Sequence, residues 1–158
     1  MSIERIFISP SAGSDQSECR LIELVAGQGI VNDRNFGKAA YPGQNITLVE
    51  AEEIERFCRQ TGSPPDLSMT RRNLVVRGIR LNDLVGRQFR IGDSVLVGVE
   101  LCEPCRTLGH RLANASLTPA AVLKYWVGRG GLRADVVRSG SVSCGDALTT
   151  SLSSAGGP

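Results

Sequence analysis

The sequence predicts a mostly β protein, folded as a small closed or nearly closed β-barrel with a few peripheral helices. Two observations support this class: the strand-like runs are short and separated by glycine-containing turns, and only two segments have helical character. Helices do not alternate regularly with strands, which disfavours a doubly wound parallel sheet. Closing so small a sheet into a barrel would remove its exposed edges.

The first half of the chain contains three expected strands and one expected helix. The strands are residues 3–8, 20–25 and 46–49. Between the second and third strands, residues 27–44 show no periodicity, and so long a loop in a compact domain is usually functional or disordered. Residues 50–60 are expected to form a helix, because Ile54, Phe57 and Cys58 fall on one stripe.

The second half is richer in strand signals, at residues 73–76, 88–91, 94–101 and 132–137. The pairs Gly92-Asp93 and Gly145-Asp146 each separate short strand-like runs, so both are predicted to be tight hairpin turns. Thr118 and Pro119 predict the N-cap and first position of a helix over residues 120–126. We therefore expect one domain over residues 1–150 and a flexible tail over residues 151–158.

Composition limits the classes of function. The 158 residues suit one domain, and a hydrophobic content of 41% is typical of a globular protein. A formal charge of +2 is too small to predict binding to nucleic acid or a membrane surface. The first residues lack a long apolar stretch, so we expect no signal peptide and no transmembrane span. Five cysteines in a chain without a secretion signal predict reduced thiols and a cytoplasmic location.

The run Cys102-Glu103-Pro104-Cys105 follows an apolar alternation and places thiols at the mouth of a strand. A structural zinc or iron–sulfur site is disfavoured, because the other cysteines are scattered singly and His110 is the only histidine. Two interpretations stay open besides buried structural cysteines. One is a reactive thiolate supported by nearby basic residues, and the other is a thioredoxin-like redox pair with Cys102 as nucleophile.

Three basic clusters lie at strand edges or in glycine-rich segments. They are Asn32-Asp33-Arg34, Arg71-Arg72-Asn73 and the run from Arg129 to Arg133. Arginine binds phosphate or carboxylate through two parallel hydrogen bonds, and neighbouring glycines let the backbone approach the same anion. Together with a reactive cysteine, the clusters indicate an anionic ligand with affinity for sulfur.

Seven segments in order resemble the MOSC domain, the molybdenum cofactor sulfurase C-terminal domain. The similarity extends over about residues 3–150 and is carried by residues 8–13, 25–34, 44–50, 71–76, 86–92, 102–105 and 131–134 followed by 145–146. The chain has Asn32 where the family's glycine-aspartate-arginine loop carries glycine. The resemblance implies a small β-barrel with peripheral helices, in agreement with the strand pattern.

The resemblance also implies a site that binds the pterin-based molybdenum cofactor or carries activated sulfur. Cys105, preceded by proline, matches the family's strand-ending cysteine and is the expected molybdenum ligand and catalytic residue. The expected cofactor-binding residues are Asp33, Arg34, Arg71, Arg72, Asn73 and Arg133. Molybdenum with its dithiolene ligand is soft and suits a thiolate, and the arginines would hold the cofactor phosphate while lowering the pKa of Cys105. The chain is too short to contain a pyridoxal-phosphate domain, so that cofactor is not expected.

The leading hypothesis from the sequence is a molybdenum-dependent reductase of N-hydroxylated or related small molecules. The chain has no flavin or iron–sulfur motif, so electrons would come from a separate donor protein. One alternative is a non-catalytic carrier of sulfur or molybdenum cofactor that works with a sulfur donor protein. The other is a thiol–disulfide oxidoreductase that uses Cys102 and Cys105. The sequence leaves open whether the protein is an oxidoreductase or a sulfur-transfer protein.

Overall fold

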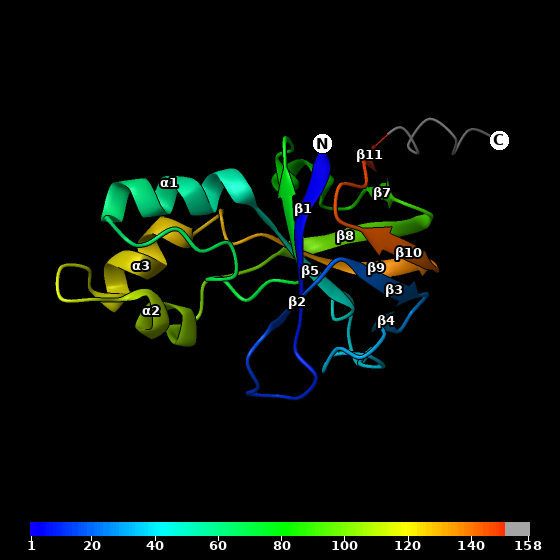
Figure 1. Cartoon of the computed structure of the whole chain (residues 1–158), viewed down its shortest axis with the longest axis horizontal. Helices are drawn as coiled ribbons and strands as arrows, with labels where there is room; N and C mark the ends of the chain where they lie inside the picture. The colour runs from blue at the N-terminus through cyan, green and yellow to red at the C-terminus, as the bar shows by residue number, and fades with distance from the viewer. Residues whose placement is uncertain (151–158) are drawn as a thin grey trace.

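The computed structural model describes residues 1–150 as a β structure with three α-helices gathered at one side (Figure 1). The predicted tail, residues 151–158, lies outside the described residues. The strands are β1 (Ser2–Ile8), β2 (Ser17–Cys19), β3 (Leu21–Val25), β4 (Gly29–Ile30), β5 (Ile46–Glu50), β6 (Leu74–Arg77), β7 (Gln88–Ile91), β8 (Ser94–Leu101), β9 (Leu132–Arg138), β10 (Gly140–Ser143) and β11 (Leu148–Thr149). The helices are α1 (Ala51–Thr61), α2 (Arg106–Leu112) and α3 (Pro119–Trp126), with a short 3₁₀ turn η1 (Leu81–Leu84).

The larger sheet is mixed and has eight strands in the order β11-β7-β8-β9-β5-β6-β1-β2. Its one parallel pair is β5 with β6, where Leu48 lies opposite Leu74, and α1 forms part of the connection between them. A parallel pair needs such a crossover, whereas its antiparallel neighbours can be joined by short turns. The smaller sheet has the order β10-β3-β4 and is antiparallel.

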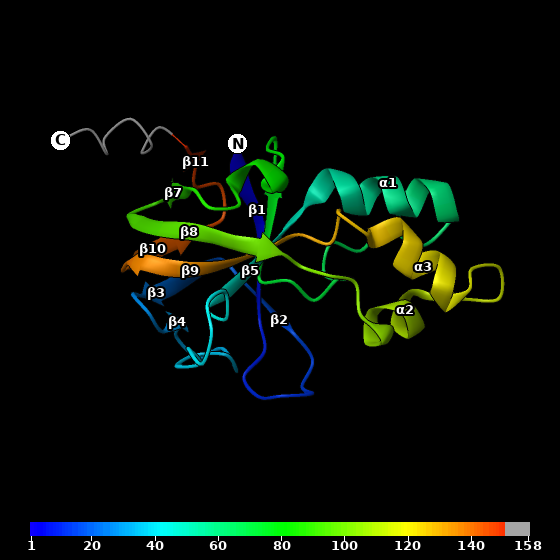
Figure 2. The same cartoon turned by 180° about the vertical axis from the view of Figure 1, so that it is seen from behind.

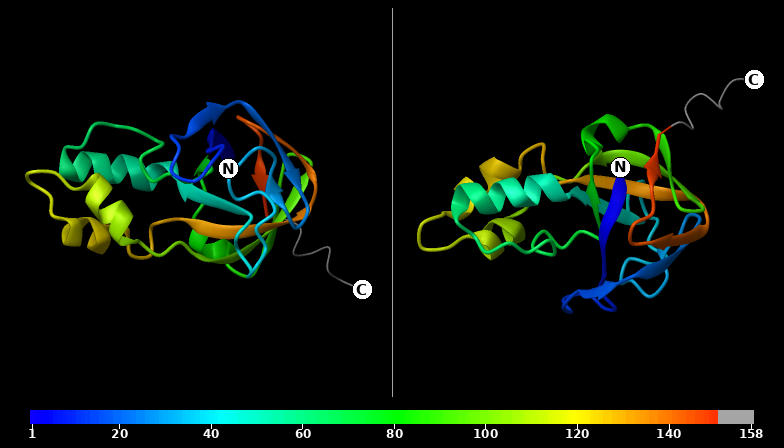
Figure 3. Two further views of the ribbon diagram at one scale, coloured as in Figure 1. Left: turned by 90° about the horizontal axis from the view of Figure 1, so that it is seen from below. Right: turned by 45° about the horizontal axis from the view of Figure 1, so that its top comes forward.

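The two sheets share one hydrophobic core. Ile22 and Leu24 of β3 and Val142 of β10 belong to the same buried cluster as side chains from β1, β5, β7, β8 and β9. Seen from below and with the top tilted forward, the strands curve around one part of the molecule while the helices project to one side (Figure 3). This shared core therefore fixes the ends of the strands, from which the loops emerge.

A second core joins the helices to the sheet. It contains Phe57 of α1, Leu108 of α2 and Trp126 of α3, together with Val49 and Val75 of the sheet. The rings of Phe57 and Trp126 lie 5.3 Å apart between centroids, a favourable separation for aromatic packing. From behind, β8 runs directly toward α2 and α3 (Figure 2). This core fixes α2 relative to the end of β8.

The predicted closed β-barrel is wrong. The large sheet ends at β11 on one side and at β2 on the other, and these strands do not pair with each other. The chain leaves this sheet after β9 and uses β10 to build the second sheet with β3. The mostly β composition with some helices is as expected.

Several local predictions are confirmed. Thr118 caps α3 by accepting a hydrogen bond from the Ala121 N–H at 3.1 Å, and Pro119 begins the helix. Gly92-Asp93 connects the antiparallel pair β7 and β8. The predicted hairpin at Gly145-Asp146 is wrong, because the flanking strands β10 and β11 lie in different sheets.

The sequence pattern did not predict α2, and its central residue Gly109 is a poor helix former. Gly109 is buried inside α2, where a β-carbon would approach the Pro119 carbonyl oxygen and the Leu123 Cγ to 3.2 Å. The missing side chain thus lets α2 and α3 pack closely. No helix within residues 1–150 has the length and apolar character needed to cross a membrane.

Candidate functional site

The main candidate site is a cavity of about 420 Å³ at the junction between the sheets and α2. Its walls come from α2 and from four connections: the β1–β2 loop, the β4–β5 loop, the loop before β6 and the β8–α2 connection. Figures 1 and 2 show the β1–β2 loop and α2 on the same side of the molecule. We call this cavity the Cys105 cavity, because Cys105 lines it beside Arg34, Arg71, Arg72 and Arg111.

Cys105 is solvent-exposed and occupies the N-cap position of α2. The backbone N–H of Leu108, in the first turn of α2, is the main cause that lowers the pKa of Cys105, against the opposing effect of desolvation. The backbone of Thr107 and the positive charge of Arg72 lower this pKa further. Cys105 is therefore both accessible and disposed to ionise, which are the two properties of a reactive or metal-binding thiol.

Cys102 has the opposite properties. Its side chain is 1% exposed, and burial raises the pKa of its thiol although Arg72 and Arg133 act to lower it. The thioredoxin-like hypothesis needs Cys102 to be the accessible, low-pKa nucleophile. That expectation is wrong, because the exposed member of the CxxC pair is Cys105.

A smaller, polar cavity of about 100 Å³ adjoins the Cys105 cavity. We call it the narrow cavity. Arg34, Arg71 and Arg72 line both cavities, and the narrow cavity is also lined by Asp33, Asn73 and Arg133. The structure thus brings all seven sequence-predicted site residues to one connected region.

The shared arginines have no carboxylate partner among residues 1–150. None of the ion pairs within 4.0 Å includes Arg34, Arg71, Arg72 or Arg111. The Arg71 Nη2 donates to the Ser14 carbonyl at 2.7 Å and the Arg72 Nε donates to the Gly130 carbonyl at 3.0 Å, which orients both guanidinium groups. Unpaired and oriented guanidinium groups around one cavity favour an anionic ligand.

Two backbone positions at this site adopt left-handed conformations without being glycine. Arg71 has φ +57° and Asn32 has φ +72°. Asparagine tolerates this region, which explains how Asn32 replaces the glycine of the family's loop. For arginine the conformation is uncommon, and such outliers cluster at functional sites because the surrounding structure must maintain them.

Asp33 and Asn73 are buried and build the site from within. The Asp33 carboxylate accepts hydrogen bonds from the N–H groups of Ser9 at 3.0 Å and Asn35 at 3.1 Å. The Asn73 Oδ1 accepts from the Thr47 N–H and hydroxyl, and its Nδ2 donates to the Phe7 carbonyl at 3.1 Å. These bonds hold the adjacent arginines in place and leave Asn73 one free N–H for a ligand.

Arg133 lines the narrow cavity and does not line the Cys105 cavity. Its Nε is 3.9 Å from the Glu100 carboxylate, and both side chains are substantially exposed. This exposed pair is weak, so Arg133 remains available to an anion in the narrow cavity.

Sequence reasoning missed three residues of the site. Arg111 lies on α2 and faces the Cys105 cavity, where partial desolvation and the neighbouring charge of Arg71 lower its pKa. Thr70 is 2% exposed and lines the same cavity with an Oγ1 that has no hydrogen-bond partner. The Gln16 Oε1 is likewise buried and unpartnered beside the narrow cavity. The position of Thr70 directly before the Arg71-Arg72-Asn73 cluster was the one available signal.

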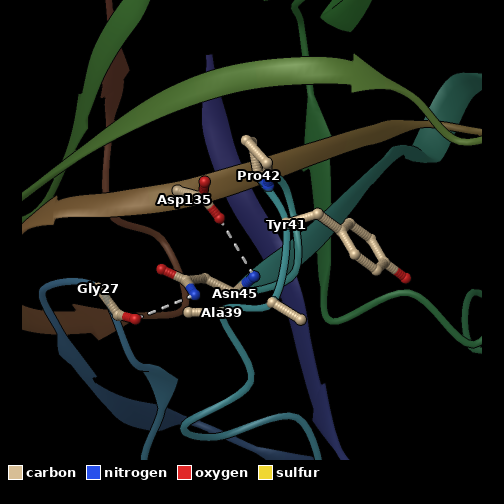
Figure 4. A pocket seen from close by; sticks show the side chains of 7 residues that line it. Gly27, Ala39, Tyr41, Pro42, Asn45 and Asp135 are labelled. Carbon is tan, nitrogen blue, oxygen red and sulfur yellow. Dashed lines mark hydrogen bonds between the residues drawn. The ribbon is translucent and has the colours of Figure 1, made fainter.

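Another hollow, of about 290 Å³, lies under the loop that leads into β5 (Figure 4). Its one charged lining residue is Asp135, whose carboxylate accepts from the N–H groups of Gly43 at 2.9 Å and Asn45 at 3.4 Å. No sulfur or basic side chain lines this hollow. Its polar groups therefore stabilise the loop and make it a poorer candidate than the Cys105 cavity.

The fold and site describe a small β protein that presents one reactive thiol in an arginine-lined cavity. The family model for the MOSC domain matches residues 33–149, so the chain belongs to the MOSC domain family. Cys105 and eight of the nine other site residues described above fall within that match, and only Gln16 precedes it. The eight are Asp33, Arg34, Thr70, Arg71, Arg72, Asn73, Arg111 and Arg133.

Solved structures show the same fold. The YuaD protein from Bacillus subtilis superposes with a TM-score of 0.80 at 22% identity, covering 93% of each chain. YiiM from Geobacillus stearothermophilus has a TM-score of 0.73 at 15% identity, covering 94% of this chain and 73% of its own. YiiM from Escherichia coli has a TM-score of 0.67 at 19% identity, covering 94% and 69%. No curated protein gives a significant match.

Proposed function

We propose that this MOSC protein binds the pterin-based molybdenum cofactor, with Cys105 as the protein ligand of the metal. The observation that carries the proposal is an exposed, low-pKa thiol in a cavity whose arginines have no carboxylate partners within residues 1–150. A thiolate is the soft ligand that suits molybdenum, and guanidinium groups suit a phosphate. No group of three or more metal-binding side chains occurs in this part of the chain, so the cofactor would have to supply the metal's other ligands.

The residues present fit such a cofactor. The narrow cavity offers Arg72 and Arg133 to a phosphate. The buried and unpartnered Gln16 Oε1 beside this cavity is an acceptor to which an N–H of the pterin could donate. Arg34 and Arg71 line both cavities and would neutralise charge between the phosphate and Cys105.

The proposed activity is reduction of an N-hydroxylated or related small molecule, with electrons from a separate donor protein. When bound, the cofactor would supply a redox-active metal for removing the N-hydroxyl oxygen. Two electrons from the donor protein and two protons from solvent complete the amine and water. Cys105 would hold the metal from the cavity wall, and Arg71 and Arg72, each oriented by a hydrogen bond to a backbone carbonyl, would orient anionic groups. The buried Asp33 keeps the Arg34 loop against β1.

Molybdenum analysis tests the binding step. The protein is expressed in a host that makes the cofactor, and metal content is compared among wild type, Cys105→Ser and Cys144→Ser. Cys144 lies in a separate hollow with Cys19, so its variant is a matched control. We expect bound molybdenum in wild type and Cys144→Ser and a strong reduction in Cys105→Ser. Equal molybdenum in all three proteins would contradict the role of Cys105.

Reductase activity is tested with the loaded protein and an N-hydroxylated purine, supplied with chemical and protein electron donors. Turnover that requires both molybdenum and Cys105 supports the reductase. Absence of turnover with every donor, in a protein that holds molybdenum, counts against it.

The exposure of Cys105 also favours a second candidate, a carrier that holds activated sulfur as a persulfide on this residue. A persulfide on an exposed thiol can be reached by an acceptor protein, whereas one on the buried Cys102 could not. Mass spectrometry of protein isolated from cells distinguishes the two candidates. One additional sulfur on the Cys105 peptide, without bound molybdenum, supports the carrier.

A further inference from the structure

We propose that Arg111 makes the Cys105 cavity selective for substrates that carry an anionic group, a carboxylate or a phosphate, beside the reacting atom. The inference rests on the proposed function for the position of the reacting centre at Cys105. It adds the chemical class of the substrate and the residue that recognises it.

Each of the two cavities has one arginine that the other lacks. Of these two cavities, Arg133 lines only the narrow cavity and Arg111 lines only the Cys105 cavity, while the three shared arginines line both. If the narrow cavity holds the cofactor phosphate, Arg111 is left without an anion on the thiol side. No carboxylate within residues 1–150 lies within 4.0 Å of the Arg111 guanidinium to satisfy it.

A second observation also indicates a polar ligand on this side. The Thr70 hydroxyl is buried at 2% exposure, has no hydrogen-bond partner and belongs to the wall of the Cys105 cavity. A ligand oxygen in this cavity could accept from Thr70 and from Arg111 together. Thr70 directly precedes Arg71, whose left-handed backbone fixes the turn that presents both side chains.

The size of the cavity agrees with a small substrate. A volume of about 420 Å³ falls within the range of small-molecule sites. Arg111 is held by α2, which packs through Leu108 and the close contact of Gly109 with α3. Recognition by a side chain on a packed helix is more selective than recognition by a loop, because the guanidinium position is restricted.

Alkylation of Cys105 tests this inference without any cofactor. Iodoacetate and iodoacetamide have similar size and the same leaving group, but only iodoacetate is an anion. The rates at the Cys105 peptide are measured by mass spectrometry with each reagent, and their ratio is compared among variants. The ratio cancels any change in the thiolate fraction, because both reagents need the same thiolate.

We expect Arg111→Gln to lower the iodoacetate-to-iodoacetamide ratio about fivefold, as removal of one nearby positive charge in a partly screened site implies. Arg106→Gln is the matched control, because Arg106 lies on the same helix but does not line the cavity. It should change the ratio less than about twofold. Arg111→Lys, which keeps the charge, should retain most of the preference.

Two results would overturn the inference: an unchanged ratio in Arg111→Gln, or an equal fall in Arg106→Gln, which would indicate only a general field. The Arg111 side chain is exposed, and a circular-dichroism spectrum and a urea midpoint close to those of wild type verify that the variant keeps its fold. Molybdenum content of the same variants reports the proposed function separately. A protein without molybdenum but with the expected ratio keeps the anion site and loses the cofactor assignment.

Discussion

Replacing Asn73 by alanine separates a scaffolding role from a ligand role at the site. Asn73 is 5% exposed and makes three side-chain hydrogen bonds, to the Thr47 N–H at 3.1 Å, the Thr47 hydroxyl at 3.2 Å and the Phe7 carbonyl at 3.1 Å. Each buried hydrogen bond contributes about 1 kcal/mol, and partners left unsatisfied add to the loss. We therefore expect Asn73→Ala to lower the free energy of unfolding by about 3 kcal/mol.

Urea denaturation followed by circular dichroism measures this change, and Asn82→Ala provides the control. Asn82 makes one such bond, from its Nδ2 to the Gly128 carbonyl at 3.0 Å, so its replacement should cost about 1 kcal/mol. A loss below about 0.5 kcal/mol in Asn73→Ala would refute the scaffolding role. If that stable variant also failed to bind molybdenum, Asn73 would be a direct ligand contact.

Three further outcomes are expected. Burial raises the pKa of Glu50 above its ordinary 4.5. The folded protein therefore loses stability as the pH rises through the folded-state pKa of this carboxyl group. Glu50→Gln should have a higher melting temperature than wild type near neutral pH, and this difference should disappear in acid. Gly131→Ala should destabilise by more than about 2 kcal/mol in urea, because φ is +104° and a β-carbon would overlap a β5 carbonyl, whereas Gly128→Ala, in open space, should cost about 1 kcal/mol. Peptide-resolved alkylation should modify Cys105 fastest and Cys102 slowest, and the reverse order would restore the redox-pair hypothesis.

The local structure was largely predictable, because short-range chemistry determines it. The stripe of Ile54, Phe57 and Cys58 indicated α1, and Thr118 with Pro119 indicated α3. The closed or nearly closed barrel was predicted wrongly, because strand order depends on contacts between distant segments of the chain. The turn at Gly145 shows the same limit: its chemistry predicts a turn but not which sheets the next strands join.

The site was predictable to a similar extent. Arginine clusters and a cysteine at a strand end indicated most of its lining, and the resemblance to the MOSC family indicated that they converge. Arg111 was missed because α2 was not expected. Without that helix, the sequence does not predict that the Arg111 side chain points into the Cys105 cavity. The hydrogen bonds of Asn73 were missed for another reason. They join Asn73 to Phe7 of β1 and to Thr47 of β5, which are 66 and 26 residues away in the sequence.

X-ray absorption at the molybdenum edge tests Cys105 ligation most directly. The spectrum of loaded wild-type protein reports how many sulfur atoms surround the metal, and the same measurement on Cys105→Ser reports which of them the protein contributes. We expect the variant to show one sulfur neighbour fewer, or to hold no metal, while Cys144→Ser matches wild type. Identical sulfur shells in wild type and a metal-loaded Cys105→Ser would contradict the assignment of this thiolate as the molybdenum ligand.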